Sequence, residues 1–197
     1  MTIKDVANYL EEIAPLQQAE DFDNVGLLIG DYQTKVTGIL VTLDTLEETI
    51  EEAIANKCNL IVSFHPIIFS GLKKINGNSY VERVVLKAIQ NNIAIYATHT
   101  ALDNSKVGVS AKMCEVLGLQ NTSILLPKEN SDIGMGMMGE LAEPMNENDF
   151  LNYVKMIFNS GGVRHSKSLN KSIKKVAVLG GSGSFAISAA INEKADV

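Results

Sequence analysis

The chain has 197 residues, of which 46% are hydrophobic and 20% are charged, and its formal net charge is -6 at pH 7. This length allows one large domain or two small ones, and it is ample to bury a hydrophobic core. The acidic balance argues against a nucleic-acid partner or an anionic membrane surface, because proteins bind both mainly through clustered Lys and Arg side chains.

Cysteine usage and the N-terminal sequence favour a cytoplasmic protein. Cys58 and Cys114 lie in apolar segments and form no Cys-x-x-Cys motif, so we expect reduced, buried thiols. The first residues, MTIKDVANYLEE, carry charges too early for a secretory signal. No apolar run approaches the length of a membrane-spanning helix, so we expect no membrane partner.

Helical and strand-like apolar patterns alternate along the chain. The first predicted helix begins with the capping pattern Thr2-Ile3-Lys4-Asp5 and ends near Pro15. The elements that follow are strand 37–43, a helix from residue 45, strand 59–63, helix 79–91, strand 93–97 and helix 109–117. Because the strands are short and fully apolar, this alternation predicts an α/β fold with mostly parallel sheets covered by helices.

A change in composition separates the chain into two predicted halves. Residues 127–139 are rich in Gly, Met and polar side chains, and we expect a linker at 127–136 between residues 1–126 and residues 137–197. The alternation then resumes with a strand near 137–141, a helix at 147–158, a strand at 175–179 and, after the turn GGSGS, a helix through about 193. The closing ADV is typical of the start of another strand, so we expect that the second half is C-terminally incomplete.

Polar side chains follow three of the predicted strands, and they are Asp44, His65, His99 and Asp103. The carboxyl ends of parallel strands are where open α/β folds place their sites. One histidine at a strand end is commonly a satisfied polar group. The three placements together are also consistent with a metal or acid–base site, because imidazole and carboxylate ligands suit Zn, Fe, Mn or Ni ions that activate water.

Three other stretches each have a structural and a functional interpretation. The segment VAVLGGSGSFA has the strand–glycine–helix order that can cradle a phosphate, but a tight strand-to-helix turn is the preferred interpretation. A nucleotide-binding oxidoreductase built on GGSGS is a third and weaker functional hypothesis. The segment FDNVG is read from physical principles as a turn with side-chain caps, although it could approach the site edge. His165, beside Arg164, is interpreted as a surface residue.

Several stretches together resemble the Nif-three-like family, whose members are also called GTP cyclohydrolase 1 type 2 homologues. The resemblance covers nearly the whole chain in order, through FDNVGLLIGD, SFHPIIF, THTALD, MGELAEPM and KKVAVLGGSGS. SFHPIIF and THTALD are its most specific parts. The resemblance implies an α/β fold of two similar halves, a ring-shaped homohexamer and a pair of divalent transition-metal ions in each subunit.

The resemblance also implies roles for individual residues. His65 corresponds to the second histidine of a metal-binding pair, and Asp103 corresponds to a metal-binding aspartate. His99 corresponds to a histidine beside the metals, where as a catalytic residue it would orient a ligand or move a proton. The residues that correspond to positions bordering the site, and that we expect to contact substrate, are Asp23, Asn24, Gly181 and Gly183.

Two departures from the family pattern bear on the expected metal site. Phe64 stands where many members have the first histidine of the pair, and nothing in the chain matches the C-terminal histidine and glutamate ligands. We therefore expect two metals or fewer. The implied function is a metal-dependent hydrolase that acts on a small, nucleotide-like substrate. The alternative is a non-enzymatic, metal-binding oligomer that serves as an interaction or regulatory module.

Overall fold

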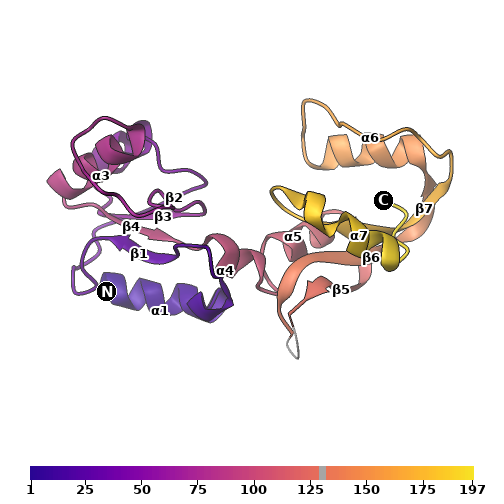
Figure 1. Cartoon of the computed structure of the whole chain (residues 1–197), viewed down its shortest axis with the longest axis horizontal. Helices are drawn as coiled ribbons and strands as arrows, with labels where there is room; N and C mark the ends of the chain where they lie inside the picture. Colours follow the sequence, from indigo (N-terminus) through magenta and orange to yellow (C-terminus); the bar gives the residue numbers. More distant parts are fainter. Residues whose placement is uncertain (129–131) are drawn as a thin grey trace. The chain divides into compact units, whose positions relative to one another are not determined.

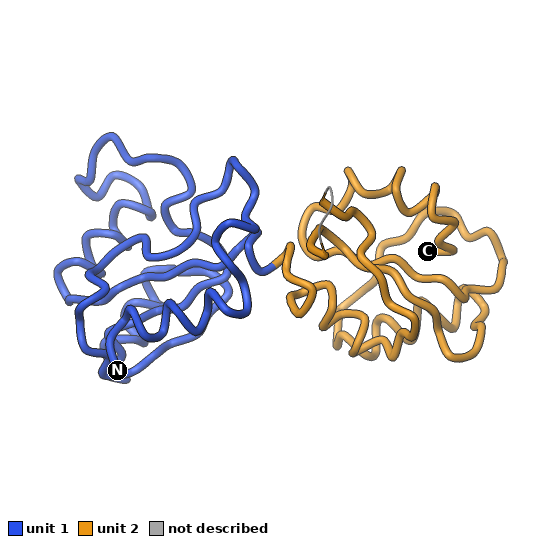
Figure 2. The backbone as a smooth tube through the Cα atoms, turned by 90° about the horizontal axis from the view of Figure 1, so that it is seen from below, with its two compact units in different colours: residues 1–102 blue, residues 103–197 orange. Residues whose placement is uncertain are grey.

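The computed structural model describes residues 1–128 and 132–197, which form two compact units (Figure 2). Unit 1 comprises residues 1–102 and unit 2 comprises residues 103–197. The boundary therefore lies before Asp103 and not at the predicted linker 127–136, of which residues 129–131 lie outside the described residues. The reason is that β5 (Gln120–Pro127) pairs with β6 (Gly134–Asn146), so the predicted linker joins two neighbouring strands of unit 2.

The sheet of unit 1 has four strands in the order β1-β4-β3-β2. The strands are β1 (Gly26–Ile29), β2 (Ile39–Thr42), β3 (Leu60–Ser63) and β4 (Ala94–Ala97). β2, β3 and β4 run parallel, while β1 is antiparallel to β4. Every residue of the two central strands, β3 and β4, is buried, which explains their uninterrupted apolar sequences.

Helices cover both faces of this sheet (Figure 1). One face packs against α1 (Ile3–Ile13), and the other packs against α2 (Glu47–Ala55) and α3 (Tyr80–Gln90). Successive residues of β3 enter different clusters, because Leu60 contacts the α1 side and Ile61 the α2 and α3 side. The sheet is therefore the middle layer of three.

Local sequence signals fix where two of these helices begin. The Thr2 side chain accepts a hydrogen bond from the Asp5 backbone N–H, and the Asp5 carboxylate accepts one from the Thr2 backbone N–H at 2.7 Å. This is the capping box expected from the sequence. At α3, the Ser79 hydroxyl accepts a hydrogen bond from the Glu82 backbone N–H at 3.2 Å. Each cap satisfies an N–H group that has no partner within its helix.

The sheet of unit 2 has three antiparallel strands in the order β5-β6-β7, and its third strand is β7 (Ser172–Val178). α5 (Val109–Val116) and α6 (Glu147–Ile157) pack against it through Leu141, Phe150 and Ile173, among others. The α/β class expected from the sequence is confirmed, but the parallel pairing expected in both halves is confined to unit 1. A few residues separate β5 from β6, and such a short connection permits only antiparallel pairing.

Four short helical elements complete the described chain: η1 (Leu16–Gln18), α4 (His99–Asp103), η2 (Gly183–Ala186) and α7 (Ile187–Asn192). The closing ADV, expected to begin a strand, hydrogen-bonds alongside β7, where the Asp196 N–H donates to the Lys175 carbonyl at 2.7 Å. Within the described ranges, no helix combines the length and the apolar sequence needed to cross a membrane.

Candidate functional site

The register of the parallel strands brings three polar side chains to one edge of the unit 1 sheet, namely Asp44, His65 and His99. Thr42 pairs with Ser63, and Ser63 pairs with Ala97, so β2, β3 and β4 end level with one another. Each polar residue lies two positions beyond the end of its strand. The shared carboxyl edge predicted from the sequence is therefore present in the structure.

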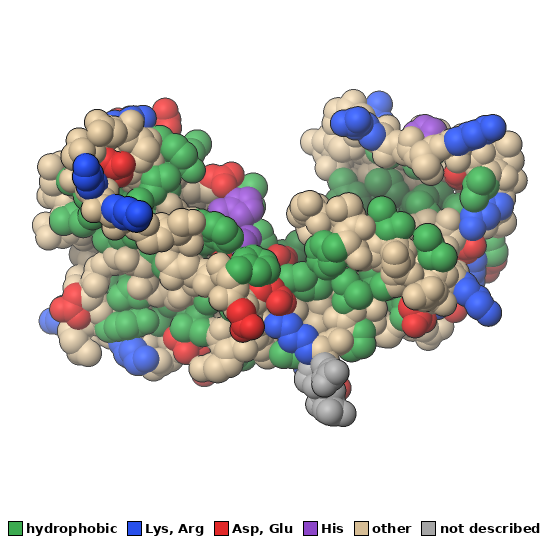
Figure 3. Space-filling model, in the orientation of Figure 1, with side chains coloured by type: hydrophobic (Ala, Val, Ile, Leu, Met, Phe, Trp, Pro, Cys, Tyr) green, Lys and Arg blue, Asp and Glu red, His purple; other side chains and the backbone are tan. Residues whose placement is uncertain are grey.

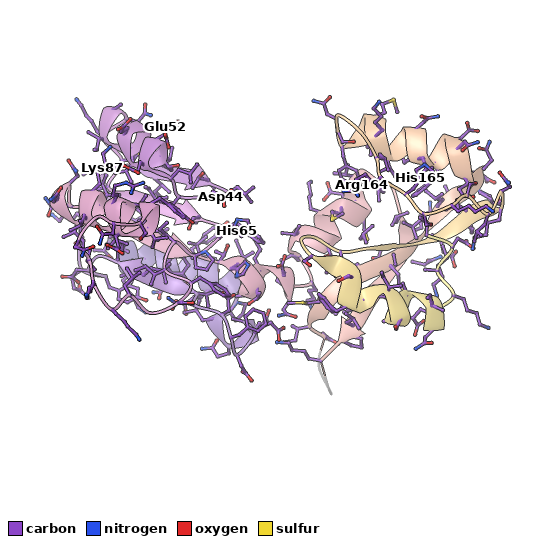
Figure 4. All side chains as sticks on the ribbon, turned by 45° about the horizontal axis from the view of Figure 1, so that its top comes forward. Asp44, Glu52, His65, Lys87, Arg164 and His165 are labelled. Carbon is purple, nitrogen blue, oxygen red and sulfur yellow. The ribbon has the colours of Figure 1, made fainter. Side chains whose placement is uncertain are left out.

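His65 forms a pair with Asp44 at this edge. The His65 Nδ1 atom lies 2.7 Å from the Asp44 Oδ1 atom, and the two side chains face one another in Figure 4. Both are accessible, with 46% of the His65 side chain and 53% of the Asp44 side chain exposed. An ionised carboxylate only accepts hydrogen bonds, so Nδ1 carries the proton. The Nε2 atom of a neutral His65 is then left as an electron-pair donor.

His99 forms a second pair, with Asp23. Gly26 of β1 pairs with Ala97 of the antiparallel β4, so the chain enters β1 at the edge where β4 ends. Asp23 lies three residues before Gly26, and its Oδ1 atom is 2.8 Å from the His99 Nδ1 atom. The Asp23 side chain is fully buried, and 19% of the His99 side chain is exposed. The motif FDN thus approaches the site edge, which is the alternative that its sequence left open.

Asp23 is held by more than His99. One of its oxygen atoms accepts the Thr100 backbone N–H at 3.0 Å and the Thr100 hydroxyl, and the other accepts the Asn24 backbone N–H at 2.7 Å. Burial raises the pKa of the Asp23 carboxyl, but the hydrogen bonds from His99, Thr100 and Asn24 outweigh burial and hold its pKa below the usual value. Asp23 is therefore a carboxylate at neutral pH. The role of Thr100 was missed at the sequence level, where a threonine after a histidine carries no distinctive signal.

The two histidine rings lie close to one another. Their centroids are 5.5 Å apart with an interplanar angle of 70°, and the edge of the Phe64 ring contacts both. His99 has a φ of +27°, a backbone conformation that side chains other than glycine seldom adopt. Such strain is often stored at functional sites. Phe64 supplies no electron-pair donor, so this position cannot bind a metal.

Asp103 and the glycine-rich turn lie in unit 2. The Asp103 Oδ1 atom is 4.0 Å from the point where a Cβ atom on Gly180 would lie, so the carboxyl group borders the turn. Gly181 has a φ of +75° and open space around it, and Gly183 begins η2. η2 and α7 are too short to supply the helix N-terminus that a phosphate site uses, which favours the tight-turn interpretation of GGSGS. The substrate contacts expected of these glycines stay predictions.

A bound metal ion requires several donor side chains grouped around one point. Within the described part of the chain, no three His, Cys, Asp or Glu side chains are grouped closely enough to hold a metal ion. His65 has the form of a ligand, because Asp44 occupies Nδ1 and 46% of the side chain is exposed, whereas the His99 side chain is 19% exposed. Asp103 belongs to unit 2 and stays a predicted ligand. His165 has its Nδ1 atom 2.7 Å from the Ser166 carbonyl oxygen on an exposed segment, as a surface residue would.

The surface around the unit 1 histidines is acidic and apolar. In Figure 3, acidic and hydrophobic side chains of the same unit border the purple histidines, and the Lys and Arg side chains on this face of the unit lie away from them. Such surroundings suit a cation or a neutral ring better than a free polyphosphate.

These features define an α/β protein with two histidine–carboxylate pairs at the carboxyl edge of its first sheet. The sequence model of the Duf34/NIF3 family (NGG1p interacting factor 3) matches residues 1–197. The chain belongs to this family, which confirms the resemblance read from its motifs.

Individual relatives and solved structures support this family assignment. The chain is 36% identical over 185 residues to the GTP cyclohydrolase 1 type 2 homolog of Clostridium acetobutylicum, a match that covers 93% of this chain and 69% of the relative. The crystal structure of a Staphylococcus aureus hypothetical protein has a TM-score of 0.93 at 33% identity and covers 100% of this chain and 77% of that one. A Bacillus cereus protein related to NIF3 also has a TM-score of 0.93, at 25% identity, with 100% and 81% covered.

Proposed function

We propose that this chain is a metal-binding protein of the hydrolase type, and that His65 and Asp103 each serve as a ligand for divalent transition metals. The observation that carries the proposal is the 2.7 Å contact between His65 Nδ1 and Asp44 Oδ1. Histidines that bind metals almost always donate their other ring N–H to a carboxylate, a carbonyl or water, which fixes the ring and makes the ligand atom more basic. Asp44 holds His65 in this way.

A divalent metal, when bound, supplies a water molecule activated near neutral pH. The chain's own contribution to catalysis is His99, whose ring Asp23 fixes through Nδ1. Its Nε2 atom would take a proton from, or return one to, a small substrate at the same edge. The name of the Clostridium relative suggests a nucleotide-like substrate. We also propose, from the family resemblance alone, a cytoplasmic homohexamer.

Metal content tests the ligand assignment. We would measure metal per subunit by plasma mass spectrometry on protein purified without chelator, for the wild type and for His65→Ala and Asp103→Ala. His165→Ala is the matched control, because it removes the remaining histidine from an exposed segment of unit 2. The proposal predicts bound metal that falls in the first two variants only. Metal-free wild-type protein, or equal metal in all four proteins, would overturn it.

A non-enzymatic, metal-binding oligomer that acts as an interaction or regulatory module is the second candidate. It is favoured by Phe64, which removes one donor, and by the lack of a three-ligand group among the residues that the structure describes. Turnover separates the two candidates. Metal-loaded protein that hydrolyses a compound from a nucleotide panel, and that loses this activity in His99→Ala, would support the hydrolase. Loaded protein without turnover across the panel would favour the module.

A further inference from the structure

Two exposed phenylalanines stand beside the histidines of unit 1. Phe22 is 66% exposed and Phe69 is 49% exposed, and their ring centroids are 6.3 Å apart with an interplanar angle of 54°. The edge-on contact between Phe69 and His99, at 6.2 Å between centroids, joins this pair to the candidate site. A large apolar ring left in water at the edge of a site loses the free energy that burial would provide. The exposed pair therefore indicates a binding surface for an apolar ligand.

The two rings are held in place by the polar residues that follow Phe22. The Asn24 Nδ2 atom donates a hydrogen bond to the Ile68 carbonyl oxygen at 2.5 Å, which ties the segment carrying Phe22 to the segment carrying Phe69. Asp23, between Phe22 and Asn24, fixes His99. Three consecutive residues thus supply a ring, orient an imidazole and fasten the second ring. A site built in this way needs little reorganisation when it binds a ligand.

We infer that Phe22 and Phe69 bind a small, uncharged aromatic heterocycle, one phenylalanine by its face and the other, tilted by 54°, by its edge, and present the polar edge of the heterocycle to His99. The inference deepens the proposed function, because it names a class of ligand for the same site. It rests on the proposed function only in placing the heterocycle at that site. Aromatic side chains stack on any conjugated ring, because both surfaces are flat and apolar. The Nε2 atom of His99, whose Nδ1 atom is held by Asp23, would then meet a polar atom at the edge of the ring. The acidic surroundings in Figure 3 favour recognition of the ring over recognition of phosphate groups.

The size of the pair favours a small molecule over a protein partner. A stable protein–protein interface buries about 800 Å² on each side. Two phenylalanine side chains, even when fully buried, would supply about half of that area, since an aromatic side chain buries roughly 150–250 Å². A single bicyclic ring matches the size of two aromatic side chains far better.

Ligand-observed NMR tests the inference with three neutral ring probes, inosine, indole and quinoline, and with ribose as the non-aromatic control. The full chain is titrated as the wild type, as the double variant Phe22→Ala/Phe69→Ala and as Tyr9→Ala, which removes an aromatic side chain 63% exposed on α1. We expect at least one ring probe to bind the wild type and Tyr9→Ala equally. The double variant should bind it about tenfold or more weakly. Ribose should not bind.

Asn24→Ala supplies a second test that removes neither ring. It releases the Ile68 carbonyl, so binding of the ring probe should weaken while both phenylalanines remain. Metal content and the melting temperature are measured on the same samples. Metal-free wild-type protein that still binds a ring through Phe22 and Phe69 would overturn the proposed function and leave this inference standing. No binding of any ring probe, or binding that the double variant retains, overturns the inference, and the second result would point to a different surface.

Discussion

His65 and His99 lie with their ring centroids 5.5 Å apart, and each has its Nδ1 atom within 2.8 Å of a carboxylate. The two carboxylates come from different parts of the sheet, since Asp44 follows β2 and Asp23 precedes β1. They also differ in burial, because Asp44 is half exposed and Asp23 is fully buried. This difference separates their roles. An accessible pair suits a metal ligand, and a buried, fixed pair suits proton transfer in a constant geometry.

Asp44→Asn tests the first pair. An amide in place of the carboxylate lowers the basicity of His65, so we expect metal affinity to fall about 10- to 100-fold. The measurement is a competitive titration against a chromogenic chelator. Glu52→Gln, which removes an exposed acidic group from α2 (Figure 4), keeps the same net charge as Asp44→Asn and should bind metal as the wild type does. Equal affinities for Asp44→Asn and the wild type would show that Asp44 does not support the ligand.

Phe64→His tests whether the missing donor limits the site. The new imidazole would stand at the position of a ring whose centroid is 5.0 Å from that of His65. A second nitrogen donor at this strand end should raise the metal bound per subunit or tighten its binding. Phe64→Leu is the control, because it removes the aromatic ring without adding a donor. Unchanged metal content in Phe64→His, with Phe64→Leu also unchanged, would mean that this position lies outside the metal site.

Much of the unit 1 edge could be predicted from the sequence, and the reason is register. Three short apolar runs, each followed by a polar residue, become a shared edge once the strands run parallel and end level, as the pairing of Thr42, Ser63 and Ala97 shows. The pairings between side chains could not be predicted in this way. Asp23 lies 76 residues from His99, and only the antiparallel return of β1 beside β4 brings the two together.

The error in the predicted boundary has a similar cause. Residues 127–136 have the composition of a linker, but a tight connection between two strands uses the same glycines and polar residues. Composition cannot distinguish the two. Tertiary pairing of β5 with β6 decides in favour of the connection, and it assigns the segment from Asp103 onward to unit 2.

Asp23→Asn tests the buried pair through stability. The Asp23 carboxylate accepts hydrogen bonds from His99, Thr100 and Asn24 through both of its oxygen atoms. In Asp23→Asn, the NH₂ group replaces one of these oxygen atoms and cannot accept the hydrogen bonds that the oxygen received. Leaving buried donors unsatisfied costs about 1–3 kcal/mol in free energy of unfolding. Urea denaturation followed by circular dichroism measures the change. Asp21→Asn, on an exposed residue of the same segment, should stay within about 0.5 kcal/mol of the wild type.

The same carboxylate predicts an acid-dependent loss of stability. The folded pKa of Asp23 is below its unfolded value, so the unfolded state takes up a proton at higher pH than the folded state does. This contribution to stability is complete above the unfolded pKa, about 3.9, and it is lost as the pH falls through the folded pKa. Urea midpoints between pH 7 and pH 2 should therefore converge for the wild type and Asp23→Asn at the acid end. A constant difference between the two proteins across this range would contradict the assigned pKa shift.

Ile61→Ala tests whether the central strand supports the site edge. Ile61 of β3 is fully buried against the helices α2 and α3. It lies two residues before Ser63, whose hydroxyl donates a hydrogen bond to the His65 carbonyl oxygen at 3.0 Å. Removing its side chain should cost about 2–5 kcal/mol in free energy of unfolding, because the lost burial and the remaining cavity both destabilise the fold. Ile89→Ala, on a residue of α3 that is 54% exposed, makes the same chemical change and should cost much less. If the two variants unfold at the same urea concentration, β3 does not form the core that positions His65.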